Sequence, residues 1–157
     1  MNNDKNTNEI KKPPFPQADV FEKIISILNI DDESLLKDKV YVSKLLGGIH
    51  ERQVAYYISA SMYLGLLTND KKFTDVANKL REKSSIRQSA DLAILILSNK
   101  VFGEVYFLQK IYGEKFDVDD VVDIMKENEI EFDSEAMYKR RARTVMCWVQ
   151  WINDLVN

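Results

Sequence analysis

A pair of glycines at positions 47 and 48 places the strongest constraint on how this chain can fold. Glycine adopts backbone angles that other residues avoid, so a glycine pair ends a helix and lets the chain turn sharply. Residues 40–46 carry apolar side chains at helical spacing, and a second helical pattern begins at Glu51. The sequence therefore predicts two helices joined by a tight turn.

The second of these helices has two distinct faces. One side of a 3.6-residue wheel collects Val54, Ile58, Ser61 and Gly65, and the other collects Arg52, Tyr56, Ser59 and Tyr63. A short turn at 69–70 follows, and the only stretch suited to a small β-hairpin is 66–74. Two helices at a glycine turn, followed by a small wing, are typical of a helix-turn-helix, a unit that reads DNA.

Composition limits the classes of protein that fit. A chain of 157 residues with 45% hydrophobic content can bury one core, in one compact domain or in two packed subdomains. The formal charge of −3 argues against non-specific coating of nucleic acid, so any DNA contact depends on local basic clusters. The single cysteine, Cys147, and the single histidine exclude an intramolecular disulfide and a Cys/His zinc site. We therefore predict no cofactor and no metal.

We also expect a cytoplasmic protein with no membrane partner. A single cysteine suits a reducing compartment. No charged start followed by an apolar run resembles a signal peptide, and the longest apolar segment, 92–97, is too short to span a bilayer.

Helical patterns predict most of the remaining fold. Residues 1–16 are rich in Asn, Lys and Pro and are expected to form a disordered tail. The apolar run 91–97 has too few polar positions for a surface helix, so we place the core there and expect Leu95 to be among the most buried residues. Amphipathic patterns predict helices over 17–28, 84–98, 99–112, 116–126 and 134–153.

The last helix repeats the pattern of the helix over 50–65. A shift of 88 residues (140 minus 52) pairs Arg52 with Arg140. Its predicted packing side is Tyr138, Ala142, Val145, Val149 and Ile152, and its predicted outer side is Arg140, Arg143, Thr144, Cys147 and Trp151. The predicted fold is mainly α, with two helix-turn-helix (winged-helix-like) units in one compact domain. The first unit covers 17–83, and core helices with the second unit cover 84–157.

Four segments together are similar to a winged-helix DNA-binding module associated with type II restriction endonucleases: RQVAYYISASMYLGLL, FTDVANKL, VFGEV and RRARTVMCWVQWI. The resemblance covers about Val40 to Ile152. It implies a module that reads DNA while a separate domain cuts. The wing is shorter than in that pattern, and the glycine that often precedes the closing helix is absent. No convincing PD-(D/E)xK set of acids and lysine is visible, so we expect a protein that is not an enzyme.

The candidate DNA contacts come from both second helices and from the wing. Arg52 and Gln53 match the edges of guanine and adenine, and Tyr56 suits a phosphate or a thymine methyl group. The predicted wing adds Lys71 and Lys72. The last helix adds the candidates Lys139, Arg140, Arg143 and Thr144. For each charged residue the alternative is a solvated or ion-paired helix face.

Residues that suggest other chemistry have ordinary structural explanations. His50 precedes a helix and is interpreted as a cap, and Cys147 as a small half-buried apolar side chain. The acids at 117–123 lie where helix-start acids belong.

Two functions stay open from the sequence. The first is a protein that binds double-stranded DNA, as the recognition part or a relative of a restriction system. The alternative is a winged-helix protein–protein interaction module or a small transcriptional regulator. A separate catalytic or protein partner and a homodimer are left open. One basic face made by Arg52, Arg140 and Arg143 would favour the first function, and dilution by acids would favour an interaction module.

Overall fold

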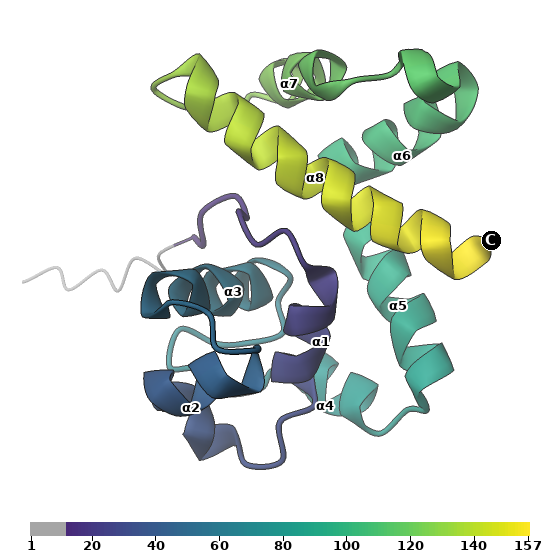
Figure 1. Cartoon of the computed structure of the whole chain (residues 1–157). Helices are drawn as coiled ribbons and strands as arrows, with labels where there is room; N and C mark the ends of the chain where they lie inside the picture. Colours follow the sequence, from purple (N-terminus) through teal and green to yellow (C-terminus); the bar gives the residue numbers. More distant parts are fainter. Residues whose placement is uncertain (1–11) are drawn as a thin grey trace, which may run out of the picture.

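The computed structural model describes residues 12–157, and within them the fold consists of eight α-helices and two short 3₁₀ helices (Figure 1). In this part of the chain the only β pairing is one antiparallel bridge between Leu67 and Phe73. The helices are α1 (Phe21–Leu28), η1 (Glu33–Lys37), α2 (Lys39–Leu45), α3 (Glu51–Tyr63), α4 (Asp75–Arg81), α5 (Ser85–Leu97), α6 (Lys100–Tyr112), η2 (Gly113–Lys115), α7 (Val118–Glu127) and α8 (Glu135–Val156). The prediction of a mainly α fold with at most one small hairpin is confirmed.

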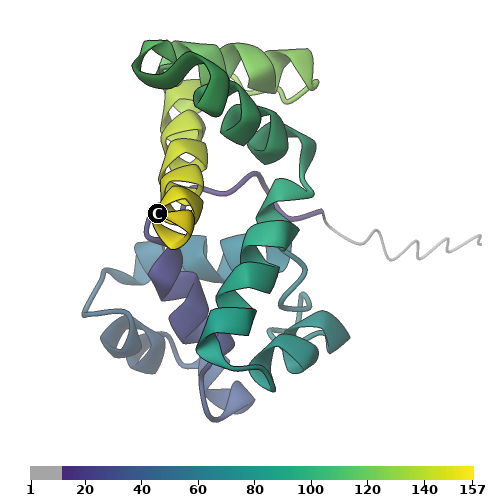
Figure 2. The same ribbon diagram turned by 90° about the vertical axis from the view of Figure 1, so that its right-hand side faces the viewer.

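Two groups of three helices make up most of the molecule. In the first group α3 packs against α1 and α2, and in the second α8 packs against α6 and α7. The long helix α8 also contacts α1 and α5, so it joins the two groups (Figures 1 and 2). Helices α3 and α8 therefore each pack against two helices of their own group.

Local capping explains where the key helices begin. The Nδ1 atom of His50 accepts a hydrogen bond from the backbone N–H of Arg52 at 3.1 Å, which confirms the histidine as the cap of α3. Asp117 and Asp120 form a reciprocal capping box at the start of α7. Gly47 and Gly48 both have positive φ angles, 87° and 79°, which explains why glycines occupy the turn before α3.

Trp148 on α8 lies at the centre of the core. Its side chain is fully buried between the rings of Phe21 on α1 and Phe102 on α6, with ring centroids 5.3 Å and 5.1 Å away. Its indole N–H donates to the backbone carbonyl of Ala18 at 2.7 Å. One side chain thus connects α8 with both groups of helices and with the segment before α1.

The prediction for the apolar run 91–97 is wrong in part. Leu92 and Ile96 are fully buried, but Leu95 is only half-buried and Ile94 is exposed. Helix α5 packs against α4, α6 and α8 and leaves its remaining side uncovered, because within residues 12–157 no further element lies over it. The run is apolar on both sides although only one side enters the core.

The predicted outer side of α8 is also wrong at two positions. Thr144 and Trp151 are buried, and Trp151 packs 4.3 Å from Phe21, measured between ring centroids. Helices α6 and α7 cover one side of α8, while α1 and the segment before it cover another. A helix packed on two sides has a much narrower exposed face than an ordinary amphipathic helix.

The predicted tail is wrong for the part that the structure describes. Residues 1–11 lie outside the described residues, but Phe15 packs against Tyr63, Phe102 and Phe132, with ring centroids 5.6 to 6.4 Å apart. Pro16 and Ala18 are buried, and residues 12–20 form neither helix nor strand. Prolines prevent a helix here, but they do not prevent a neighbouring aromatic ring from entering the core.

Candidate nucleic-acid interface

The first turn of α3 presents Arg52, Gln53 and Tyr56 together. Arg52 and Gln53 are exposed, and Tyr56 follows Arg52 by one helical turn. The Nε atom of Arg52 donates to the Tyr56 hydroxyl at 2.8 Å, and the guanidinium lies 5.9 Å from the centre of the tyrosine ring. Among the described residues none accepts from the terminal nitrogens of Arg52, so the guanidinium is positioned and still able to donate.

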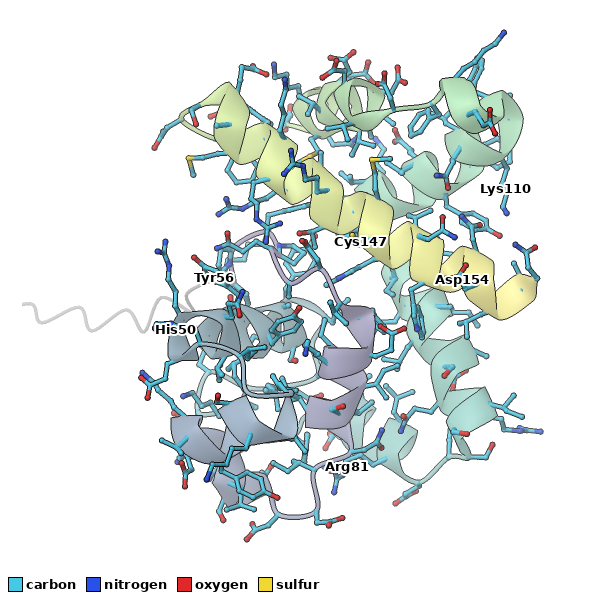
Figure 3. All side chains as sticks on the ribbon, in the orientation of Figure 1. His50, Tyr56, Arg81, Lys110, Cys147 and Asp154 are labelled. Carbon is cyan, nitrogen blue, oxygen red and sulfur yellow. The ribbon has the colours of Figure 1, made fainter. Side chains whose placement is uncertain are left out.

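The start of α8 lies across a shallow groove from this turn. The groove has a volume of about 250 Å³, and its lining includes Gln53 and Tyr56 from α3, Arg140 from α8, and residues 17–20 between the helices. Figure 3 shows Tyr56 between α3 and α8, and His50 at the beginning of α3. The fold thus brings together candidate residues that are more than 80 positions apart. We call this surface, with Arg52 and Arg141, the α3–α8 junction.

Arg140 is already engaged within the protein. Its Nη1 atom donates to the carboxylate of Asp19 at 2.9 Å, and its Nη2 atom donates to the backbone carbonyl of Gln17 at 3.0 Å. The hydroxyl of buried Thr144 donates to the same Asp19 oxygen at 2.6 Å. The predicted DNA contacts Arg140 and Thr144 therefore hold the segment before α1, and Thr144 offers no surface to a ligand.

Replacing Asp19 with alanine tests this arrangement. The free energy of unfolding should fall by about 1–3 kcal/mol, because the buried hydroxyl of Thr144 loses its acceptor and the guanidinium of Arg140 loses its ion pair. Urea denaturation followed by circular dichroism measures the loss. Asp154→Ala is the control, since Asp154 is exposed and accepts only from Gln150, and it should change stability by less than about 0.5 kcal/mol. Equal losses for the two variants would contradict the structural role of Asp19.

Arg141 is the functional candidate that the sequence analysis did not select. Its guanidinium lies 5.1 Å from the ring centre of Phe132, and its Nε atom is buried with no hydrogen-bond partner among the described residues. Partial burial lowers the pKa of Arg141, and repulsion from Arg140 lowers it further, whereas nearby Tyr56 acts in the opposite direction. The group stays protonated at neutral pH. Within residues 12–157 the Arg141 guanidinium forms no ion pair, so an anion could neutralise its charge.

The other basic candidates lie elsewhere. Lys139 and Arg143 are exposed on α8 and line a shallow pocket with Asp117 and Asp119 at the start of α7. Lys71 and Lys72 belong to the turn closed by the bridge between Leu67 and Phe73, where Lys71 has a positive φ of 58°. Arg52, Arg140 and Arg143 therefore do not make one continuous basic face.

Two further features of the described residues bear on the chemistry. No group of three histidine, cysteine or acidic side chains in 12–157 could hold a metal ion, and no helix there is long and apolar enough to cross a membrane. Cys147 is exposed, and partial burial of its thiol raises the pKa, so the thiol stays protonated near neutral pH.

Comparison with known proteins gives one match. The model of a family described as "Domain of unknown function (DUF7226)" matches residues 23–157, which include most of α1 and every later helix. No curated protein and no solved structure matches the chain.

Proposed function

This chain belongs to the DUF7226 family, and we propose that it is a non-catalytic protein that binds duplex DNA through the α3–α8 junction. The observation that carries the proposal is that two cationic side chains from different helices, Arg52 and Arg141, form no ion pair among the described residues. Arg52 is bonded to Tyr56, which lines the groove together with Arg140, the neighbour of Arg141 in the sequence. Guanidinium groups in such positions bind phosphate or a guanine edge through paired hydrogen bonds.

Four residues of the junction have different proposed roles. Arg52 and Gln53 project from the first turn of α3, which follows the glycine turn, and in a helix-turn-helix this part of the second helix reaches base edges. Tyr56 in the groove and Arg141 on α8 contact the phosphate backbone. Phosphate contacts place the helix on the duplex, and base contacts select the sequence.

The resemblance to restriction-associated modules suggests the biological system in which the protein acts. A protein of this kind would be the recognition part, or a relative, of a restriction system in the cytoplasm, with any cleavage carried out by a separate partner. The charge of −3 is compatible with this role, because a local pair of arginines can bind DNA while the remaining surface repels non-specific contacts.

Two substitutions separate the proposed roles. A fluorescence anisotropy titration first selects a preferred duplex from a mixed pool and then repeats the binding over a salt series. Arg52→Ala should weaken binding to the preferred duplex by about 1–3 kcal/mol and relax the preference at one base pair. Arg141→Ala should weaken binding to all duplexes alike and lower the magnitude of the log K against log salt slope by about one.

Arg143→Ala is the matched control for this experiment. Arg143 is an arginine on the same helix but lies beside the acids of α7, so its loss should change binding less than the loss of Arg141. Equal binding by the wild type and by Arg52→Ala and Arg141→Ala variants at every salt concentration would end the DNA proposal.

A protein–protein interaction module is the second candidate. The observation that favours it is the division of the basic residues, with Arg140 paired to Asp19 and with Lys139 and Arg143 beside Asp117 and Asp119. Basic side chains that lie next to acids suit an equally mixed protein surface better than a uniform phosphate backbone. Absence of duplex binding by the folded wild type would leave this candidate in place.

A further inference from the structure

A groove of about 400 Å³ lies between the end of α6 and α7. From α6 it is lined by Leu108 and Tyr112, which lie one helical turn apart, and Phe116 follows after η2. Phe116 is buried and Leu108 is half-buried, whereas Tyr112 is 58% exposed. The α6 side of the groove is therefore apolar, with an aromatic ring open to a partner.

The α7 side of the groove is acidic. Asp120, Asp123 and Glu127 line it at spacings of three and four residues, which place them on one face of the helix. Within residues 12–157 none of these three carboxylates forms an ion pair. One oxygen of Asp120 accepts a hydrogen bond from the backbone N–H of Asp117, whereas Asp123 and Glu127 are exposed. Two of the three acids are thus open to a cation.

Helix capping explains only part of this charge. Acids stabilise the start of a helix, and Asp117 and Asp120 do so for α7. Glu127 is the last residue of α7, where a negative charge opposes the helix dipole. Among the described residues that line the groove, Lys115 is the only cation, so the lining has three carboxylates and one ammonium group. The groove therefore combines an apolar side with a net negative charge.

We propose that this groove binds a helix of a separate protein, whose inserted face is apolar and is flanked by lysine or arginine. The apolar side chains of that helix pack on Leu108 and Tyr112, and its cations meet Asp123 and Glu127. The acidic stripe rises about 10 Å along α7, so about two turns of the partner fit. Charge selects this occupant, because the acids repel nucleic acid and would stay unpaired beside a neutral apolar segment.

The position of the groove keeps it separate from the proposed DNA contact. Figures 1 and 2 show α6 and α7 on one side of α8 and α3 on the other. A helix bound between α6 and α7 therefore does not cover α3. The proposal does not depend on DNA binding, and either one can fail while the other stands.

A labelled model peptide tests the groove. The probe is a helical peptide of about 14 residues with leucines along one face and lysines beside them, and fluorescence anisotropy follows its binding to the full chain. Binding should saturate, and it should weaken as salt rises from about 0.05 to 0.3 M. A peptide with glutamate at each lysine position should bind at least about tenfold more weakly. No saturable binding of the lysine peptide, or equal binding of both peptides, would overturn the proposal.

Charge reversal shows where the peptide binds. The double substitution Asp123→Lys and Glu127→Lys should raise the Kd of the lysine peptide at least about tenfold, because two attractions become repulsions. The control, Asp70→Lys and Glu82→Lys, changes the net charge equally at two exposed acids outside the groove, so its effect should stay below about twofold. Thermal melting checks that both variants are folded. Equal effects of the two double variants would mean that only net charge matters, which would overturn the proposal.

A second pair of variants tests the apolar side. Tyr112→Ser should raise the Kd at least about fivefold, because the peptide loses its contact with the ring. Phe107→Ser is the control, since Phe107 is 65% exposed on the same helix but does not line the groove, and the Kd should stay within about twofold. A larger effect of Phe107→Ser than of Tyr112→Ser would place the peptide on another surface and overturn the proposal.

Discussion

Replacing Trp148 with alanine should lower the free energy of unfolding by about 3–5 kcal/mol. The side chain is fully buried and contacts the rings of Phe21 and Phe102, so its removal leaves a cavity that helices on both sides cannot easily close. The backbone carbonyl of Ala18 also loses its hydrogen-bond donor. Urea denaturation followed by circular dichroism measures the change.

Trp148→Phe separates the contribution of the aromatic ring to stability from that of the indole N–H group. This variant keeps most of the aromatic volume and loses the donor to Ala18, so it should cost about half as much as Trp148→Ala or less. A loss below about 1 kcal/mol for Trp148→Ala would contradict the central position of this residue.

Leu92→Ala should cost about 2–5 kcal/mol, whereas Leu95→Ala should cost about 1 kcal/mol or less. Both residues lie in the apolar run of α5, but Leu92 is fully buried against the core and Leu95 is half-buried. Leu95 faces a shallow pocket next to Val76 and Lys79 of α4, where water can replace the deleted methyl groups. The two variants are matched, because the same atoms are removed from the same helix.

The ratio of the two losses is the informative result. Urea denaturation of both variants under the same conditions gives it directly, provided that the m-values agree. Equal losses would mean that both sides of α5 are packed, which would contradict the half-buried position of Leu95.

Helix positions and caps could be predicted because they depend on residues close in sequence. The cap of α3 involves His50 and an amide two residues later, and the box at the start of α7 involves Asp117 and Asp120. The glycine turn at 47–48 is equally local. Such features need no knowledge of what packs against the helix.

Helix faces could be predicted only where one side is buried. On α3 the predicted inner residues Val54 and Ile58 are buried, and Arg52 is exposed. The sequence pattern predicts Thr144 on the outer side of α8, because a helix covered on two sides shows nearly the same polarity pattern as a helix covered on one side. The periodicity of a sequence shows which sides of a helix are polar and which are apolar. How much of the helix is buried depends on the number of elements that pack against it, and the pattern does not show that number.

The sequence predicts which residue types form the candidate site. It does not predict which of these residues form ion pairs within the protein. The run Lys139 to Arg143 shows four cations on one helix, but nothing local indicates that Arg140 pairs with Asp19, 121 residues away, while Arg141 forms no ion pair within residues 12–157. The pairing depends on the path of the segment before α1, which the proline-rich composition had suggested to be a tail. Long-range ion pairs follow from the tertiary fold.

That segment has a mechanical consequence for the whole molecule. Its residues are bonded to both groups of helices: the N–H of Val20 donates to the Tyr57 hydroxyl on α3 at 3.1 Å, while the carbonyl of Ala18 accepts from Trp148 on α8. The ring of Phe15 packs against Tyr63 of α3, Phe102 of α6 and Phe132 in the loop before α8. The segment 12–20 therefore lies between α3 and α8 and holds them apart. The distance between the two arginine-bearing helix starts, and with it the span of any ligand that touches both, is set by a stretch of chain that contributes no helix of its own.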